Sequence, residues 1–471
     1  MSKTKMYVGI GCLLLVVAVG IAVSVLMYSE PPDTRFSAAY RLDDGRLAIV
    51  SPYHGTELRL RIPEQGLSRP LVYTGEHNYD VGSTGAWAAV DELPAKETVS
   101  FEMVGDGPPE GFTWRRDGEQ LTARRIELRE EHFTFDSDGL KLRAKLVLPP
   151  ENLQTPGNSD RHPVVVLVHG SERTSAVDYY ADAYLFAADG VATLVYDKRG
   201  TGSSQGGYTQ NFHVLARDVV AAVDTLRGRD DIDPDDVHLA GFSQGGWVAP
   251  LAASKTEGIR SLLIGFGAMV PIVDEDRWGY VYALQKKGFG PEAVAAADRI
   301  HDSLVALMDH GEEERRDELN RMLDEAEGEA WFDALAGSDS TLGLLSENRN
   351  VPRWVMRLTT WWMLRPVDGE RRIDRLYDPV PVMAQLEVPS LWIFGGSDHS
   401  MPTEWSIDKL VDLKNEGAPA EILLYPDADH GITRYAETPN GGRRFLGFEP
   451  EYRPAMVEWV RRWSDLGPER T

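Results

Sequence analysis

The segment at residues 237–247 constrains the fold of this chain more than any other part of the sequence. It reads VHLAGFSQGGW, so an apolar run leads into a Gly-x-Ser-x-Gly pattern and a helix-forming stretch follows. This pattern is typical of a strand that turns sharply into a helix and carries one serine at the bend. Gly241 and Gly245 lack a Cβ and leave room for neighbouring backbone at such a turn. The segment therefore predicts that the Ser243 hydroxyl projects above the end of a buried strand.

Further apolar runs, which alternate with helical patterns, flank this turn. Residues 163–168 read PVVVLV, a continuous apolar run of the kind found in strands buried on both faces. Residues 211–227 carry apolar side chains at helical spacing. Other runs expected to be strands of the same sheet are 140–148, 191–196, 261–266, 390–394 and 420–425. Strands that alternate with helices predict a doubly wound, mainly parallel sheet.

Two regions depart from this alternation. Residues 36–130 hold short runs of period two, separated by Asp-Gly pairs, and this pattern predicts a small antiparallel β domain. Between residues 271 and 388 the spacing is helical, most clearly at 291–309 and 312–327. An insertion at this point of the fold lies over the carboxyl ends of the strands, where ligands bind in such sheets. We expect it to form a helical cap.

The insertion is rich in tryptophan, and the sequence leaves two interpretations of these side chains open. They can line a substrate pocket, or they can pack the cap's own core, since buried tryptophan is mostly structural. The residues concerned are Trp278, Trp331, Trp354, Trp361 and Trp362.

Changes of pattern along the chain divide it into five expected segments. These are 1–30, a transmembrane anchor or signal sequence; 31–130, the β-rich domain; 131–270, the first part of the α/β core; 271–388, the cap; and 389–471, the second part of the core.

The anchor is expected from residues 6–28, an uncharged and nearly all apolar stretch. A transmembrane helix needs about 20 such residues. Lys3 and Lys5 precede the stretch, so the positive-inside rule predicts a cytoplasmic N-terminus and an extracytoplasmic body. A signal peptide cleaved near residues 22–24 is the alternative, and the body would then be secreted.

Charge and cysteine content exclude several classes of function. The net charge is -25, from 49 basic and 74 acidic residues, so the chain should repel the phosphates of nucleic acids. Cys12 is the only cysteine and lies within the apolar stretch. An intrachain disulfide and a cysteine-based metal site are therefore excluded. The oligomeric state stays open.

Two residues downstream of Ser243 are candidates for its catalytic partners. A serine hydroxyl is a weak nucleophile until a base removes its proton. In a fold with this turn, the acid and then the histidine follow the serine along the chain. Asp398 comes just after the run 390–394, and His430 comes after the run 420–425. We expect His430 to be the base and Asp398 to orient it.

Alternatives exist for both partners. Asp274 or Asp276, after the run 261–266, could supply the acid instead of Asp398. His399 could compete with His430 as the base, although its neighbour in the sequence already fits the acid.

Acyl transfer also needs N–H donors for the negative oxygen that develops on the substrate. One expected donor is the backbone N–H of Gln244, which follows the nucleophile. The other is the N–H of Ser171, in the loop after the run 163–168, where Gly170 permits the turn. His169 in this loop is expected to position the backbone rather than to act as a base.

Taken together, these residues resemble the α/β-hydrolase superfamily, in the branch of dienelactone hydrolases, prolyl-oligopeptidase-like peptidases and bacterial esterases. The resemblance covers residues 131–267 and 388–465. It rests on HGS at 169–171, YDKRGTGS at 196–203 and GFSQGG at 241–246. It implies an ester, thioester or amide substrate and neither a metal nor an organic cofactor. It also implies that the loop at 196–203 is structural and borders the site.

Two departures from the family favour a small-molecule ester as the substrate. The chain has no propeller-sized segment of the kind that the peptidase branch carries, and it has serine where dienelactone hydrolases proper use cysteine. We expect a carboxylic-ester hydrolase that forms an acyl-serine intermediate. The alternatives are a serine aminopeptidase or an acyl thioesterase on the same residues, and a non-catalytic binding module.

Overall fold

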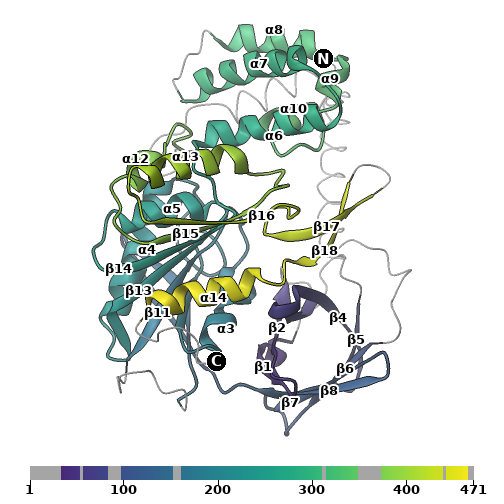
Figure 1. The fold of residues 1–471 in the computed structure, drawn as a ribbon, viewed down its shortest axis with the longest axis vertical. Helices are drawn as coiled ribbons and strands as arrows, with labels where there is room; N and C mark the ends of the chain where they lie inside the picture. Colours follow the sequence, from purple (N-terminus) through teal and green to yellow (C-terminus); the bar gives the residue numbers. More distant parts are fainter. Residues whose placement is uncertain are drawn as a thin grey trace, which may run out of the picture.

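The computed structural model describes residues 33–53, 57–82, 97–151, 161–309, 315–347, 373–438 and 442–464. In these ranges the chain forms a β-barrel, an α/β core beside it and a group of helices above the core (Figure 1). The predictions of a mainly parallel sheet and of a preceding β-rich domain are confirmed.

The N-terminal domain is a closed antiparallel barrel. Strand β1 pairs with β8 as well as with β2, and this pairing closes the barrel. The interior is filled by large buried side chains such as Tyr40, Phe112 and Trp114. The strands are β1 (Ala38–Leu42), β2 (Leu47–Tyr53), β3 (Glu57–Ile62), β4 (Leu67–Gly75), β5 (Asn78–Val81), β6 (Thr98–Glu102), β7 (Gly111–Arg116) and β8 (Glu119–Arg125).

The core is an 8-stranded sheet in the order β16-β15-β14-β13-β11-β12-β10-β9. Its strands are β9 (Arg129–Ser137), β10 (Leu140–Leu148), β11 (His162–Val168), β12 (Ala192–Tyr196), β13 (Ile232–Phe242), β14 (Ile259–Gly265), β15 (Ser390–Gly395) and β16 (Ala420–Tyr425). Strand β10 runs antiparallel to β9 and β12, and the other pairs are parallel. The chain passes from β11 to β12 on one side and then to β13 on the other. Ligands bind at such a switch point, beyond the carboxyl ends of the strands.

Helices cover both faces of this sheet because its strands are apolar on both sides. Along β11, Val164 and Val166 belong to the apolar cluster of one face, and Val165 to that of the other. The first face carries α4 (Phe212–Arg227), α5 (Gly245–Ala253), α12 (Val380–Met383) and α13 (Thr403–Asn415). The second carries α2 (Ala176–Tyr179), α3 (Asp182–Ala187) and α14 (Tyr452–Trp463).

The cap helices form a small apolar core of their own above the sheet (Figure 1). They are α6 (Ile272–Lys286), α7 (Pro291–Asp309), α8 (Arg315–Ala326), α9 (Ala330–Asp333) and α10 (Thr341–Glu347). Trp331 packs against this core, whereas Trp278 packs edge-on against Trp405 of α13. Trp331 therefore fits the interpretation that these side chains pack the cap's own core, and the role of Trp278 in a substrate pocket stays a prediction. Trp354, Trp361 and Trp362 lie outside the described residues.

A hairpin that we did not expect follows β16. It consists of β17 (Thr433–Glu437) and β18 (Arg443–Phe448). The Phe448 N–H donates to the carbonyl of Gly66 in the barrel, at 2.7 Å. The hairpin therefore connects the barrel to the loops at the edge of the sheet.

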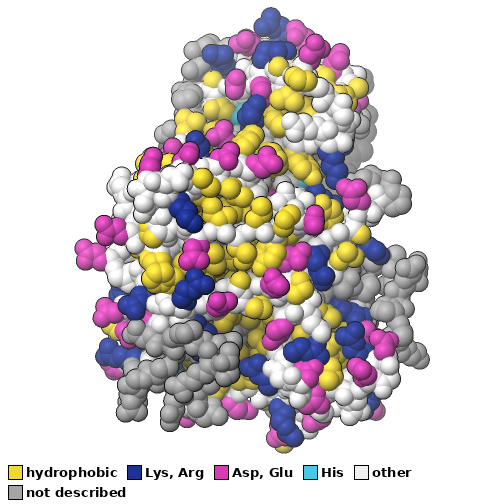
Figure 2. Space-filling model, viewed as in Figure 1, with side chains coloured by type: hydrophobic (Ala, Val, Ile, Leu, Met, Phe, Trp, Pro, Cys, Tyr) yellow, Lys and Arg dark blue, Asp and Glu magenta, His cyan; other side chains and the backbone are white. Residues whose placement is uncertain are grey.

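Within the described ranges, no helix is both long and apolar enough to cross a bilayer. The expected anchor or signal segment, residues 6–28 with Cys12, lies outside those ranges and stays a prediction. On the face that Figure 2 shows, the acidic and basic side chains of the described residues are mixed, and the basic ones do not gather into one large patch.

Candidate active site

The turn between β13 and α5 holds Ser243 in an unusual backbone conformation. Its φ is 51°, in the left-handed region that costs a residue with a side chain about 1–3 kcal/mol. A Cβ on Gly241 would lie 2.3 Å from the carbonyl oxygen of Gly245, and a Cβ on Gly245 would lie 2.1 Å from that of Val168. Only glycine fits at either position, so the two glycines let the turn pack tightly against β11.

The structure brings Ser243, His430 and Asp398 together at the carboxyl ends of three strands. The Oγ of Ser243 lies 3.2 Å from Nε2 of His430, and Nδ1 of His430 lies 2.9 Å from Oδ2 of Asp398. The other carboxylate oxygen of Asp398 accepts backbone N–H groups of Ser400 and Met401, at 2.8 and 2.9 Å. The carboxylate is buried and held in one orientation. In this arrangement the imidazole of His430 can accept the proton of the Ser243 hydroxyl, and the carboxylate of Asp398 holds the imidazole in place.

The electrostatic surroundings of His430 favour this transfer. Burial alone would lower the pKa of the imidazole, but the charge of Asp398 and its hydrogen bond outweigh burial and raise that pKa above its ordinary value. The ring of Phe266 packs edge-on against the imidazole, with centroids 4.9 Å apart. An imidazole with a raised pKa accepts the serine proton more readily. At neutral pH, however, a larger share of the imidazole groups is already protonated.

We therefore predict that kcat/KM for hydrolysis rises with pH along an acidic limb whose midpoint lies above about 6.5, the ordinary pKa of histidine. The reason is that, in the mechanism expected from the sequence, His430 must lose its proton before it can act as the base. The measurement is a pH profile of kcat/KM for the wild-type protein. A midpoint clearly below about 6.5 would contradict this electrostatic account.

The loop after β11 lies directly against Ser243. A Cβ on Gly170 would be 3.3 Å from the Cβ of Ser243, so glycine lets this loop approach the turn closely. Ser171 follows in the loop, and its carbonyl accepts a hydrogen bond from the Tyr208 hydroxyl at 2.6 Å. Gln244 is buried and stands immediately before α5, where the positive end of the helix dipole favours an anion. The N–H groups of Ser171 and Gln244 remain our predicted oxyanion donors.

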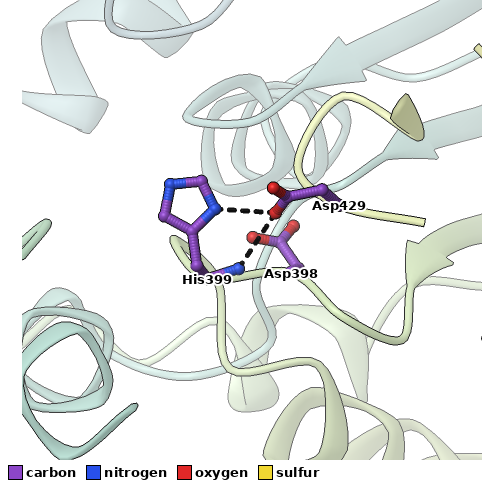
Figure 3. Close-up of side chains that lie close together, drawn as sticks. All are labelled: Asp398, His399 and Asp429. Carbon is purple, nitrogen blue, oxygen red and sulfur yellow. Dashed lines mark hydrogen bonds and ion pairs between the residues drawn. The ribbon is translucent and has the colours of Figure 1, made fainter. Parts of the chain in front are cut away.

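Three of the side chains at this edge of the sheet have the spacing of a metal site: Asp398, His399 and Asp429 (Figure 3). Their donor atoms are already in use. Asp429 Oδ1 accepts from the ring and the backbone N–H of His399 and from the N–H of His430, and Oδ2 pairs with Arg443. A cation would have to displace this guanidinium. The cluster is better suited to hold the backbone of the His430 loop.

The alternative partners weighed from the sequence lie elsewhere or have other contacts. Asp276 lies on α6 in the cap, where one carboxylate oxygen is 3.0 Å from Nε2 of His301 and the other accepts the N–H of Thr341. Asp274 is on the same helix. His399 is directed to Asp429. The structure therefore places Asp398, and none of these three residues, between a hydrogen-bonding loop and His430.

Sequence reasoning missed the face of α6 that lies over the site. The indole N–H of Trp278 donates to the carbonyl of Asp398 at 3.2 Å, and the Tyr282 hydroxyl accepts from Arg443. Glu275 lies one turn before Trp278 on the same face. Burial raises the pKa of Glu275 to about 8, and Asp276, Asp339 and Asp398 add to this effect whereas His430 opposes it. The sequence did hold a signal for this face, because residues 275, 278 and 282 are three and four positions apart and therefore lie on the same side of a helix.

Comparisons with known proteins show the family to which the chain belongs. The sequence pattern of the Alpha/beta hydrolase family matches residues 165–463, more than half of the chain. The chain is 24% identical over 323 residues to thiohydrolase aneE of Aspergillus aculeatus, a match that covers 67% of this chain and 88% of that protein. It is 35% identical over 114 residues to the quorum-quenching protein AidA of Acinetobacter baumannii, which is 24% of this chain and 35% of that protein.

The chain was also compared with solved structures. The structure of proline iminopeptidase from Mycobacterium smegmatis aligns with 71% of this chain and 99% of its own, at 17% identity and a TM-score of 0.42. The region matched by the family pattern includes Ser243, Asp398 and His430.

Proposed function

Since the chain belongs to the alpha/beta hydrolase family, we propose that it is a serine hydrolase that cleaves carboxylic esters. The observation that carries the proposal is the continuous hydrogen-bonded path from Asp398 through His430 to Ser243. This path ends at Ser243, which is held in a strained turn. The start of α5 and the loop after β11, which contains Gly170, lie beside the serine.

In the proposed reaction, the Ser243 oxygen attacks the ester carbonyl while His430 takes the hydroxyl proton. His430 then gives this proton to the departing alcohol, and an acyl-serine remains. A water molecule, deprotonated by His430, attacks the acyl-serine and releases the acid. Asp398 holds the imidazole by Nδ1 and stabilises its charged form in both steps. The N–H groups of Gln244 and Ser171 bind the negative oxygen.

A second candidate, an aminopeptidase, is favoured by the carboxylates of the cap. Trp278 connects α6 to the carbonyl of Asp398, so Glu275 on the same face lies close to the site. Asp339 is near as well, because its backbone packs on Gly279 of that helix and its charge acts on His430. The Asp339 carboxylate is complementary to a protonated amine on the substrate. Glu275, whose pKa is about 8, is mostly neutral at neutral pH and would become a second carboxylate only when such an amine binds and lowers its pKa. A thioester is the third class, since one relative is named a thiohydrolase.

The experiment that tests the proposal is a comparison of substrate classes on the full-length protein. It uses p-nitrophenyl esters from acetate to palmitate, an acyl thioester with colorimetric thiol detection, and aminoacyl p-nitroanilides. The proposal expects kcat/KM to be highest for an ester, and the best chain length gives the size of the acyl pocket. Turnover of the anilide alone would establish the peptidase, and the thioester alone the thioesterase. A folded protein that turns over none of them would favour a binding module.

A further inference from the structure

Lys198 is a buried cation behind the proposed oxyanion site. It follows β12, which is the neighbour of β11 in the sheet, and its side chain is almost completely enclosed. Its ammonium group donates a hydrogen bond to the carbonyl oxygen of Gly170 and lies 3.4 Å from Oε1 of Gln244. One side chain thus reaches both segments that are expected to supply the oxyanion donors, the loop after β11 and the start of α5.

The hydrogen bond to Gly170 has a direct consequence for Ser171. The carbonyl of Gly170 and the N–H of Ser171 belong to the same peptide group, which is planar. Fixing the direction of the oxygen therefore fixes the direction of the N–H. Charge-assisted hydrogen bonds are stronger than neutral ones, and a cation on the oxygen polarises the group, so the N–H becomes a better donor.

We propose that Lys198 is the positioning residue of the oxyanion site, and that it orients and polarises the peptide group that presents the Ser171 N–H. It acts through that peptide and through the Gln244 side chain rather than on the substrate itself. The inference rests on the proposed function of Ser243, because it concerns the strength of the oxyanion donors during acyl transfer.

Several charged or titratable groups surround Lys198. Burial lowers the pKa of its ammonium to about 8, Glu172 opposes this effect and Arg173 adds to it. Burial alone would raise the pKa of Glu172, but His169 and Tyr180 outweigh burial and lower it to about 2, so the carboxylate is charged. Burial lowers the pKa of His169 itself. The ammonium also lies 5.4 Å from the centre of the Tyr208 ring. It is therefore charged at neutral pH and loses its proton as the pH rises above about 8.

The test uses three lysine variants and the ester that the wild-type protein turns over best. Lys198→Met removes the charge and the hydrogen bond but keeps a side chain of similar length. It is expected to lower kcat by about 10- to 100-fold, with a smaller change in KM. This loss is smaller than that of a whole oxyanion donor, which lowers kcat by about 100- to 1,000-fold. Lys198→Arg keeps a charge and is expected to recover part of the loss. Lys145→Met is the matched control, because Lys145 is also buried but contacts Tyr184 of α3 and Glu130 of β9.

The pH profile of kcat separates positioning from a merely structural role. The wild-type protein is expected to lose activity along an alkaline limb near pH 8, which is absent in Lys198→Met and moves to higher pH in Lys198→Arg, since arginine stays protonated. Glu275 titrates in the same range. A limb that persists in Lys198→Met and disappears in Glu275→Gln would assign the titration to Glu275 and overturn the inference.

The outcomes also distinguish this inference from the proposed function. A wild-type esterase that depends on Ser243 but keeps its kcat and its alkaline limb in Lys198→Met would leave the function intact and refute the role of Lys198. If Lys198→Met does not fold, the pH profiles of kcat of the wild-type protein and of Lys198→Arg test the inference instead. An unaltered limb in Lys198→Arg, or no alkaline limb in the wild type, would refute it equally.

Discussion

Replacement of Ser243 by alanine is expected to lower kcat for ester hydrolysis by about 10⁴- to 10⁶-fold while the protein stays folded. The substitution removes the hydroxyl oxygen that lies within hydrogen-bonding distance of Nε2 of His430. It leaves the backbone of the turn and its two glycines in place, so packing is little changed. The measurements are kcat with the best p-nitrophenyl ester and a thermal melt of each protein.

A serine at the other end of α5 provides the control. Ser254 stands just after α5, is exposed, and donates to a carbonyl of its own helix. Ser254→Ala is expected to keep the wild-type kcat. A Ser243→Ala protein that retained more than about one-tenth of the activity would refute the assignment of the nucleophile.

Replacement of Asp398 by asparagine is expected to lower kcat by about 10⁴-fold with little loss of stability. Asparagine has nearly the same shape, but its amide can donate a hydrogen bond to Nδ1 of His430. The imidazole would then carry its proton on Nε2, where it cannot accept the proton of Ser243. The measurement is kcat at a pH above the acidic limb, where His430 of the wild-type protein is neutral.

Asp276→Asn is the matched control for this prediction. Asp276 was the other acid weighed from the sequence, and in the structure it bonds to His301 and Thr341 within the cap. We expect Asp276→Asn to keep kcat within about 10-fold of the wild type, because a conservative substitution away from the reacting groups changes the fold and the site only a little. A large loss in Asp276→Asn together with a mild effect of Asp398→Asn would show that the acid was assigned to the wrong strand.

Much of this fold could be predicted because its strongest signals are local. A continuous apolar run such as 163–168 predicts a strand buried on both faces, and the glycines around Ser243 mark one particular turn. The positions of Asp398 and His430 followed from the order of the strands that precede them. Their proximity to Ser243 in the structure agrees with that order, and their catalytic role is our proposal.

The contacts that could not be predicted join segments far apart in the sequence. Closure of the barrel depends on the pairing of β1 with β8, which no local period reveals. Arg443 reaches Asp429 because the β17–β18 hairpin brings the chain back to the loop after β16. Trp278 reaches the carbonyl of Asp398 because α6 of the cap lies over that loop. Lys198 lay in a motif to which we assigned no chemistry. Its bond to Gly170 is possible because β11 and β12 are neighbours in the sheet, and both residues follow the ends of these strands. The order of the strands in the sheet was needed to see this proximity.

The most direct test of the central claim is to find which residue of the protein acts as the nucleophile. The full-length protein is treated with a fluorophosphonate probe, and the labelled peptide is identified by mass spectrometry in the wild type and in His430→Ala. We expect a single adduct on Ser243, formed far more slowly when the base is absent, because the free hydroxyl is a weak nucleophile. A folded protein that turns over esters but carries the label on another residue, or carries none, would contradict the account.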